Sequence, residues 1–234
     1  MGIAESEGRE DEAGTGDGMT FLIDLSPQRS PEWFQSRCGL LTGSRAADML
    51  ATIKSGEAAA RRDYRMQLVT EILTGQPQED SFVNAAMQRG IDLEPKAFGA
   101  YEALTGSVAL RTGFLRHAQH RAGCSLDGHV DDFEGIVEIK CPKSATHLKY
   151  WRGKGEAPAE HLAQITHNLW ITGAQWCDFL SFDDRFPEEM QTFLVRVKRE
   201  DVDLDSYEKK ALAFLAEVEA EVNAIRTMTK GWAA

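Results

Sequence analysis

Three charged residues near the middle of the chain have types and spacing that suit metal-dependent chemistry. Glu138 and Lys140 lie two residues apart in the segment IVEIKC (136–141), whose β-branched content predicts a buried strand. Alternate residues of a strand share a face, so these two side chains project side by side. Asp127, just before Gly128, lies opposite them if the strands pair as a hairpin. Two carboxylates and an ammonium are unfavourable to bury at one sheet end without a further partner, and a divalent cation would supply one.

Mg²⁺ prefers carboxylate and carbonyl oxygens, and Mn²⁺ suits the same ligands. Asp127, Glu138 and the backbone carbonyl of Ile139 therefore make a candidate metal site, at which Lys140 could orient or deprotonate an attacking water. This is the division of work in metal-assisted phosphodiester hydrolysis. The alternative is a salt bridge on a solvated sheet face, which adds little stability. The short apolar strand, its end at Cys141-Pro142 and the third charge at hairpin distance favour the metal site.

The elements that must position these residues predict an α/β fold. Helix starts are expected at Ser30-Pro31-Glu32 and Thr42-Gly43-Ser44, from N-cap residues and a proline at the first helical position. The remaining pattern predicts helices over 57–74 and 81–105, strands over 107–116, 122–131 and 134–141, a helix over 158–172, strands over 177–182 and 193–198, and a helix over 203–228. Pro95 is expected to kink or restart the second of these helices. Together these elements indicate a mixed β-sheet flanked by helices.

Composition limits the class of protein. The 234 residues are 42% hydrophobic and 27% charged, which is typical of a soluble globular chain. No apolar run is long enough to cross a bilayer and no secretion signal is visible, so we expect a cytoplasmic protein without a membrane partner. Residues 1–20 are predicted to be a disordered acidic leader and residues 21–234 a single domain.

The net charge of -11 does not exclude a nucleic-acid partner, because a large share of it belongs to the leader. Met1 to Met19 contains six acidic residues and one arginine, a net of -5, which leaves -6 for the remainder. DNA responds to the local field rather than to the total charge, so a local basic surface is compatible with this balance.

The four cysteines form no C-x-x-C pair, which argues against a zinc knuckle, an iron-sulfur cluster and a disulfide framework. His117 and His120 form an H-x-x-H with Cys124 nearby, which could hold zinc. No fourth ligand is evident, and a polar loop beside Arg116 and Arg121 explains the motif equally well.

The wider pattern resembles the PD-(D/E)xK nucleases, and within them the lambda-exonuclease (YqaJ-like) branch of viral recombination nucleases. The resemblance covers about residues 29–200. It depends on five blocks in the family order: Trp33 with RCGLLTGS (37–44), RGIDLE (89–94), CSLDG (124–128), EIKCP (138–142) and AQI (163–165). A single Glu-x-Lys is weak support, whereas five ordered blocks are strong.

The resemblance implies a role for each matching residue. Asp127, Glu138 and the Ile139 carbonyl would hold one or two Mg²⁺ ions with support from Glu94. Lys140 and Gln164 would complete the catalytic group. The remaining matches imply DNA contacts: Arg37, Ser44 and Ser125 at the 5′-phosphate, Lys54 on the DNA where the family has arginine, and Met87 as an apolar wedge at the terminal base pair, with a core methionine as its alternative.

The activity implied is a Mg²⁺-dependent 5′ to 3′ exonuclease that digests one strand of linear double-stranded DNA to mononucleotides. It would leave a 3′ single strand for a phage-type annealing protein, and the assembly would be a ring-shaped homotrimer around DNA. Two alternatives stay open: another nuclease of the same core, such as an endonuclease or a RecB-like domain, and a DNA-end-binding module without turnover. Intact Asp127, Glu138 and Lys140 argue against the module, because a pure binder has no need of a metal pocket.

Overall fold

The computed structural model describes residues 21–78, 84–153 and 155–232, and the predicted leader lies outside them. The described chain is a mixed α/β fold with the element order β1 (Phe21–Asp24), α1 (Pro31–Arg37), β2 (Leu41–Thr42), the 3-10 turn η1 (Gly43–Arg45), α2 (Ala46–Met49), α3 (Ala59–Thr74), α4 (Ala85–Thr105), β3 (Phe114–His117), β4 (Ala122–Ser125), β5 (Gly128–Val130), β6 (Gly135–Lys140), α5 (Ser144–Trp151), α6 (Ala159–Thr172), β7 (Trp176–Phe182), η2 (Glu188–Met190), β8 (Thr192–Lys198), η3 (Arg199–Asp201) and α7 (Leu204–Trp232). Within these residues, no helix combines the length and the apolar character needed to span a membrane.

The strands divide into two mixed four-stranded sheets, where the sequence predicted one. The first has the order β1-β3-β4-β2 and the second β5-β6-β7-β8. In the second sheet, β6 forms an antiparallel hairpin with β5 and a parallel pair with β7. β6 is therefore an inner strand, bonded on both edges, and it carries the charged residues of interest.

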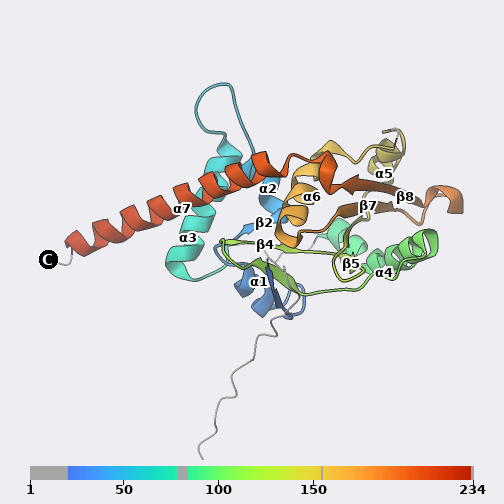
Figure 1. Cartoon of the computed structure of the whole chain (residues 1–234), viewed down its shortest axis with the longest axis horizontal. Coiled ribbons are helices and arrows are strands. Elements are labelled where there is room, and N and C mark those ends of the chain that lie inside the picture. Colours follow the sequence, from blue (N-terminus) through green and yellow to red (C-terminus); the bar gives the residue numbers. More distant parts are fainter. Residues whose placement is uncertain (1–20, 79–83, 154, 233–234) are drawn as a thin grey trace, which may run out of the picture.

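Helices cover both faces of the second sheet (Figure 1). On one face, Val137 and Ile139 of β6 pack with Leu93 and Phe98 of α4. On the other, Ile136 joins the larger core that contains α6 and α7. The alternation along β6 thus matches the period of two expected for a strand, and Glu138 and Lys140 belong to the face that looks toward α6. The C-terminal part of α7 extends beyond the other elements (Figure 1).

Local capping signals explain where several helices begin and end. The Ser30 hydroxyl accepts the Trp33 amide at 3.1 Å, as expected for the predicted N-cap. Gly75 and Gly106 end α3 and α4 in the left-handed conformation, with φ of 67° and 72°. Asn84 caps α4 by accepting the Met87 amide at 2.9 Å.

Three predictions about individual elements differ from the structure. The strand expected over 107–116 forms only at Phe114–His117, because only these residues have strand partners in β1 and β4. The strand expected over 122–131 is split at Leu126-Asp127 between the two sheets. Pro95 lies inside one uninterrupted helix, which apolar packing against the sheet holds together. The sequence pattern did not predict β1 or α5. Residues 81–83 of the helix predicted over 81–105 lie outside the described residues.

The β6–β7 pair requires a glycine at position 135. A Cβ on Gly135 would lie 2.0 Å from the Trp176 ring, and the Arg196 guanidinium lies over that ring at 3.5 Å from its centroid. We expect Gly135→Ala to lower the free energy of unfolding by about 1–3 kcal/mol through overpacking. Gly99→Ala is the matched control. Gly99 is exposed in α4 with open space around its missing Cβ, so this change should be neutral or stabilising by up to about 1 kcal/mol. Urea unfolding of both variants measures the difference, and equal effects would contradict the packing argument.

His167 ties α6 to its neighbours and gives the fold a pH dependence. It is fully buried between the Tyr207 hydroxyl at 2.7 Å and the Gly123 carbonyl at 2.9 Å, and burial lowers its pKa to about 4. The unfolded chain, with a histidine pKa near ~6.5, binds the proton first, so this contribution to stability is lost as pH falls from about 6.5 toward 4.

Proton binding is linked to unfolding, so the free energy of unfolding should fall between pH 7.5 and pH 5.5. We expect this fall to be roughly 1 kcal/mol smaller in the His167→Gln variant than in the wild type. Tyr207→Phe removes one hydrogen-bond partner of the His167 ring but keeps the titrating ring itself. Its free energy of unfolding should therefore change with pH as in the wild type. Urea unfolding at the two pH values provides the measurement. An unchanged slope in His167→Gln would refute the assignment.

Candidate active site

Glu138 and Lys140 lie side by side on β6, as the strand period predicts. Glu138 is buried, with 1% of its surface exposed, and its two oxygens have different partners. Oε1 accepts a hydrogen bond from the Lys140 ammonium, and Oε2 accepts one from Nδ2 of Asn168 on α6 at 3.2 Å. The carboxylate is therefore held from its own strand and from the helix packed over it.

Asp127 joins this pair through the β5–β6 hairpin. Gly128 is paired with Val137, which sets Asp127 opposite Glu138. The Ile139 amide donates to Oδ2 of Asp127 at 2.6 Å, so the carboxylate is fixed against the strand that carries the other two charges. Non-glycine residues Asp131, Asp132 and Phe133 make the turn with φ of 49°, 51° and 68°. The predicted hairpin geometry is confirmed.

The three charges do not neutralise one another fully. Burial raises the pKa of Glu138 to about 7, although Lys140 lowers it in part, and Asp127 raises it further. Burial likewise raises the pKa of Asp127 against the opposing effect of Lys140. Burial alone would lower the pKa of Lys140, but the carboxylates of Glu138 and Asp127 raise it above its ordinary value. A single ammonium thus faces two acids, which leaves negative charge available to a cation.

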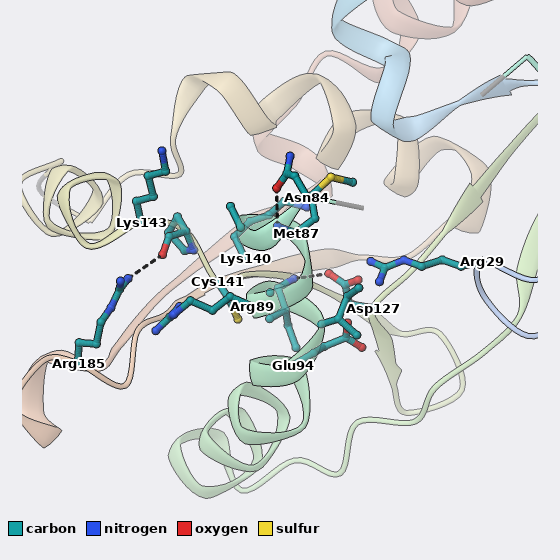
Figure 2. A pocket seen from close by; sticks show the side chains of 15 residues that line it. Arg29, Asn84, Met87, Arg89, Glu94, Asp127, Lys140, Cys141, Lys143 and Arg185 are labelled. Carbon is teal, nitrogen blue, oxygen red and sulfur yellow. Dashed lines mark hydrogen bonds between the residues drawn. The ribbon is translucent and has the colours of Figure 1, made fainter. Parts of the chain in front are cut away.

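A cavity of about 480 Å³ opens beside this group, between the start of α4 and the end of β6 (Figure 2). Asp127, Ile139 and Lys140 line it, and so does Glu94 of α4. Figure 2 shows Glu94 next to Asp127. Glu94 pairs with Arg111 at 2.9 Å, yet burial and the nearby Asp127 raise its pKa. Glu94 of α4 therefore lies close to Asp127 in the link before β5, and Asp127 in turn interacts electrostatically with Glu138 on β6.

The donor set suits a hard divalent cation. Asp127 and Glu138 supply carboxylates, and the Ile139 carbonyl, the third candidate ligand, directly follows Glu138 on β6. In the described ranges, no group of three His, Cys, Asp or Glu side chains is placed to hold an ion alone. Mg²⁺ commonly takes one or two carboxylates and completes its shell with water and substrate phosphate oxygens, so the residues present fit it. The metal roles of Asp127, Glu138, Ile139 and Glu94 stay predictions.

Basic side chains surround the cavity, and the sequence analysis did not find most of them. Arg29, Arg89, Lys143 and Arg185 line its walls, and Figure 2 shows Arg29 reaching toward Asp127. Arg89 also bonds to Asp184 at 2.8 Å. These residues come from four separate segments, and only Arg89 belongs to a sequence block that the family resemblance uses. The cavity wall thus carries basic side chains in an acidic chain, of which Arg89 and Arg185 are both paired with Asp183.

The predicted phosphate-binding residues lie at one end of the first sheet. Arg37 is buried and stacks on the Trp33 ring at 4.1 Å, and its Nη1 lies 3.5 Å from the Ser125 hydroxyl. β2 runs parallel to β4, and Thr42 is paired with Gly123. Ser44 and Ser125 are each two residues beyond this pair, so both lie at the C-terminal end of these strands. Arg37 and Ser125 are brought together, and Ser44 is exposed on the adjoining turn.

Three other predicted residues have different positions. Met87 lines the cavity at the start of α4 and is 49% exposed, which contradicts the core alternative. Lys54 is exposed in the loop between α2 and α3 and does not line the cavity. Gln164 is half-buried on α6 and also does not line the cavity. The DNA and catalytic roles of these residues stay predictions.

Polar side chains of α6 are partly directed at the site. Asn168 bonds to Glu138, and His161 bonds to the Tyr150 hydroxyl at 3.0 Å. Burial and the nearby Lys140 lower the pKa of His161 to about 4, so this ring is neutral beside the ammonium. His167 points elsewhere, to β4 and α7. Asn168 therefore contacts the proposed catalytic group from α6, a contact that no motif in the sequence indicated.

The H-x-x-H motif has a structural explanation. The His117 and His120 rings stack at 4.5 Å, and His117 stacks on Trp170 at 5.1 Å. Nδ1 of His117 accepts the backbone amide of His120 at 3.2 Å, and Cys124 is buried in the core. Among the described residues, no three His, Cys, Asp or Glu side chains are placed together to hold a metal ion, so this motif gives no support to the zinc interpretation. His117 is also buried rather than part of an exposed polar loop.

Comparison with known proteins gives consistent results. A model of the YqaJ-like viral recombinase domain matches residues 32–175. Two crystal structures of the alkaline exonuclease LHK-Exo from Laribacter hongkongensis, one in complex with dAMP, are 38% identical to this chain. Each match covers 87% of this chain and 100% of the other, with a TM-score of 0.78.

A phage-related exonuclease from Haemophilus somnus 129PT is 14% identical, over 80% of this chain and 96% of that chain. Its TM-score of 0.64 shows a shared fold. Curated protein sequences give no match. The domain match, the identity to the Laribacter exonuclease and the common PD-(D/E)xK-like fold lead to one conclusion: the chain belongs to the lambda-exonuclease, YqaJ-like family of viral recombinases.

Proposed function

We propose that the protein is a Mg²⁺-dependent 5′ to 3′ exonuclease that digests one strand of linear double-stranded DNA from 5′-phosphorylated ends. The observation that carries this proposal is the group of Asp127, Glu138 and Lys140, fixed on a hairpin beside a cavity with basic walls. Family membership and the Laribacter exonuclease support nuclease activity in general. The dAMP in one Laribacter structure is a mononucleotide, which is the product that we propose.

The chain's own residues can perform the steps that the cleavage needs. A divalent cation at Asp127 and Glu138 would supply positive charge for the attacking water and the leaving oxygen. Lys140 is an ammonium beside both acids, because their charges raise its pKa. As an ammonium, Lys140 can orient the scissile phosphate and stabilise the negative charge that develops on its oxygens. The protonated state favours this electrostatic role over the role of a base.

The Arg37 and Ser125 pair supports recognition of the DNA end. Ser125 is two residues before Asp127, so the proposed 5′-phosphate site and the proposed metal site are joined by a very short segment. A guanidinium held against Trp33 and a hydroxyl can donate several hydrogen bonds to a terminal phosphate. Digestion would leave a 3′ single strand for an annealing protein. We further propose a ring-shaped homotrimer as the processive form.

Replacing Lys140 tests the chemical step. We expect Lys140→Ala to reduce digestion by about 10²–10³-fold, the range for loss of one group that stabilises charge in the transition state, while binding to a 5′-phosphorylated duplex persists. Lys149→Ala is the control, since Lys149 is 69% exposed on α5 and pairs only with Glu160 among the described residues. Gel assays of digestion and of binding in Ca²⁺ measure both properties. If Lys140→Ala is misfolded by circular dichroism, the residue forms a structural ion pair; if it is folded and fully active, the assignment is wrong.

The DNA end provides a second test. A linear duplex with 5′-phosphates should be digested in Mg²⁺ and protected by chelation, a duplex with 5′-hydroxyl ends should be slower, and a closed circle should survive. Arg37→Ala should reduce the preference for phosphate by about tenfold or more, because a charge-assisted hydrogen bond to phosphate contributes roughly 1.5–3 kcal/mol. Cutting of the circle would indicate an endonuclease. Binding without digestion by the wild type would indicate an end-binding module.

A further inference from the structure

The second carboxylate oxygen of Glu138 is held by a residue outside the proposed catalytic group. Nδ2 of Asn168 donates to Oε2 at 3.2 Å, while Oε1 bonds to Lys140. A carboxylate can only accept, so the amide nitrogen of Asn168 must face it and the amide oxygen must point away. The two hydrogen bonds together fix the plane of the Glu138 carboxylate.

Asn168 itself is immobilised by its surroundings. It is 1% exposed and lies in the last turns of α6, where Ile165 and Leu169 are also buried. Its neighbour His167 bonds to β4 and to Tyr207, which prevents a shift of the helix along the sheet. The donor that faces Glu138 is thus presented from a rigid element.

Gly43 makes room for this amide. A Cβ on Gly43 would lie 2.5 Å from Oδ1 of Asn168, closer than side-chain atoms approach one another. The backbone of Gly43 is not left-handed, so the glycine is required here by space. Oδ1 of Asn168 is buried and has no hydrogen-bond partner within the described chain. The turn that presents Ser44 therefore packs directly on the residue that orients Glu138.

We infer that Asn168 is a positioning residue, which orients the Glu138 carboxylate so that it can bind the divalent cation together with Asp127. This inference rests on the proposed function, because it assigns a purpose to a contact of the proposed metal site. Leucine at position 168 has nearly the shape of asparagine but would leave Oε2 of Glu138 without its donor. Partners of ligating carboxylates commonly contribute a factor of about 10–100 to metal affinity.

Metal binding to the purified, metal-free full chain tests the inference without relying on activity. We expect Asn168→Leu to raise the Kd for Mn²⁺, measured by titration calorimetry with MnCl₂, by about tenfold or more. Thr172→Val is the matched control. Thr172 is also buried in α6 and bonds to the Asn168 carbonyl at 2.7 Å, but it does not touch Glu138. It should lower the melting temperature while leaving the Kd for Mn²⁺ unchanged.

A wild-type Kd in folded Asn168→Leu would overturn the inference, and so would equal weakening in Asn168→Leu and Thr172→Val. If the leucine variant does not fold, Asn168→Ala replaces it in the same titration, with the same expected and contrary results. Failure of the proposed function gives a different result: the wild type itself would bind no Mn²⁺ and digest no DNA. A wild type that binds Mn²⁺ and digests DNA, alongside an unaffected Asn168→Leu, would reject the role of Asn168 alone.

Discussion

Burial of charge on an inner strand is the constraint around which this structure is arranged. Glu138 and Lys140 lie on β6, which is bonded to β5 on one edge and to β7 on the other. Removing charged groups from water is unfavourable by several kcal/mol for each ion unless hydrogen bonds compensate. The Lys140 ammonium and the Asn168 amide provide those bonds for Glu138. The compensation is partial, since burial still raises the pKa of Glu138 to about 7. Such a site favours a further positive charge, which is what a cation-binding site requires.

The boundary between the two sheets sets the spacing of the proposed functional groups. β4 ends at Ser125 in the first sheet and β5 begins at Gly128 in the second, so Asp127 lies in the short link between them. Ser125 contacts Arg37, whereas Asp127 bonds to the Ile139 amide. On the proposed assignment, the same link fixes how far the terminal phosphate lies from the bond that is cut. On that assignment, a rigid separation of this kind would select the first phosphodiester of a DNA end.

α6 connects these two regions from the opposite side. His167 bonds to the Gly123 carbonyl on β4, and Asn168 bonds to Glu138 on β6. Asn168 also packs against Gly43 in the turn before Ser44. Consecutive residues of one helix therefore contact both sheets. The orientation of the acidic group and the position of the turn proposed to bind phosphate consequently depend on the same rigid element.

Much of the local structure followed from the sequence alone. Ser30, Gly75 and Gly106 act within a few residues of themselves, so their capping roles were readable from sequence. The strand period placed Glu138 beside Lys140, and the hairpin placed Asp127 opposite them, for the same reason. Only the tertiary structure decided the rest. The split of residues 122–131 between two sheets, the basic cavity wall drawn from four segments, and the contact of Asn168 with Glu138 and Gly43 all depend on packing between residues far apart in the chain, which periodicity and spacing do not encode.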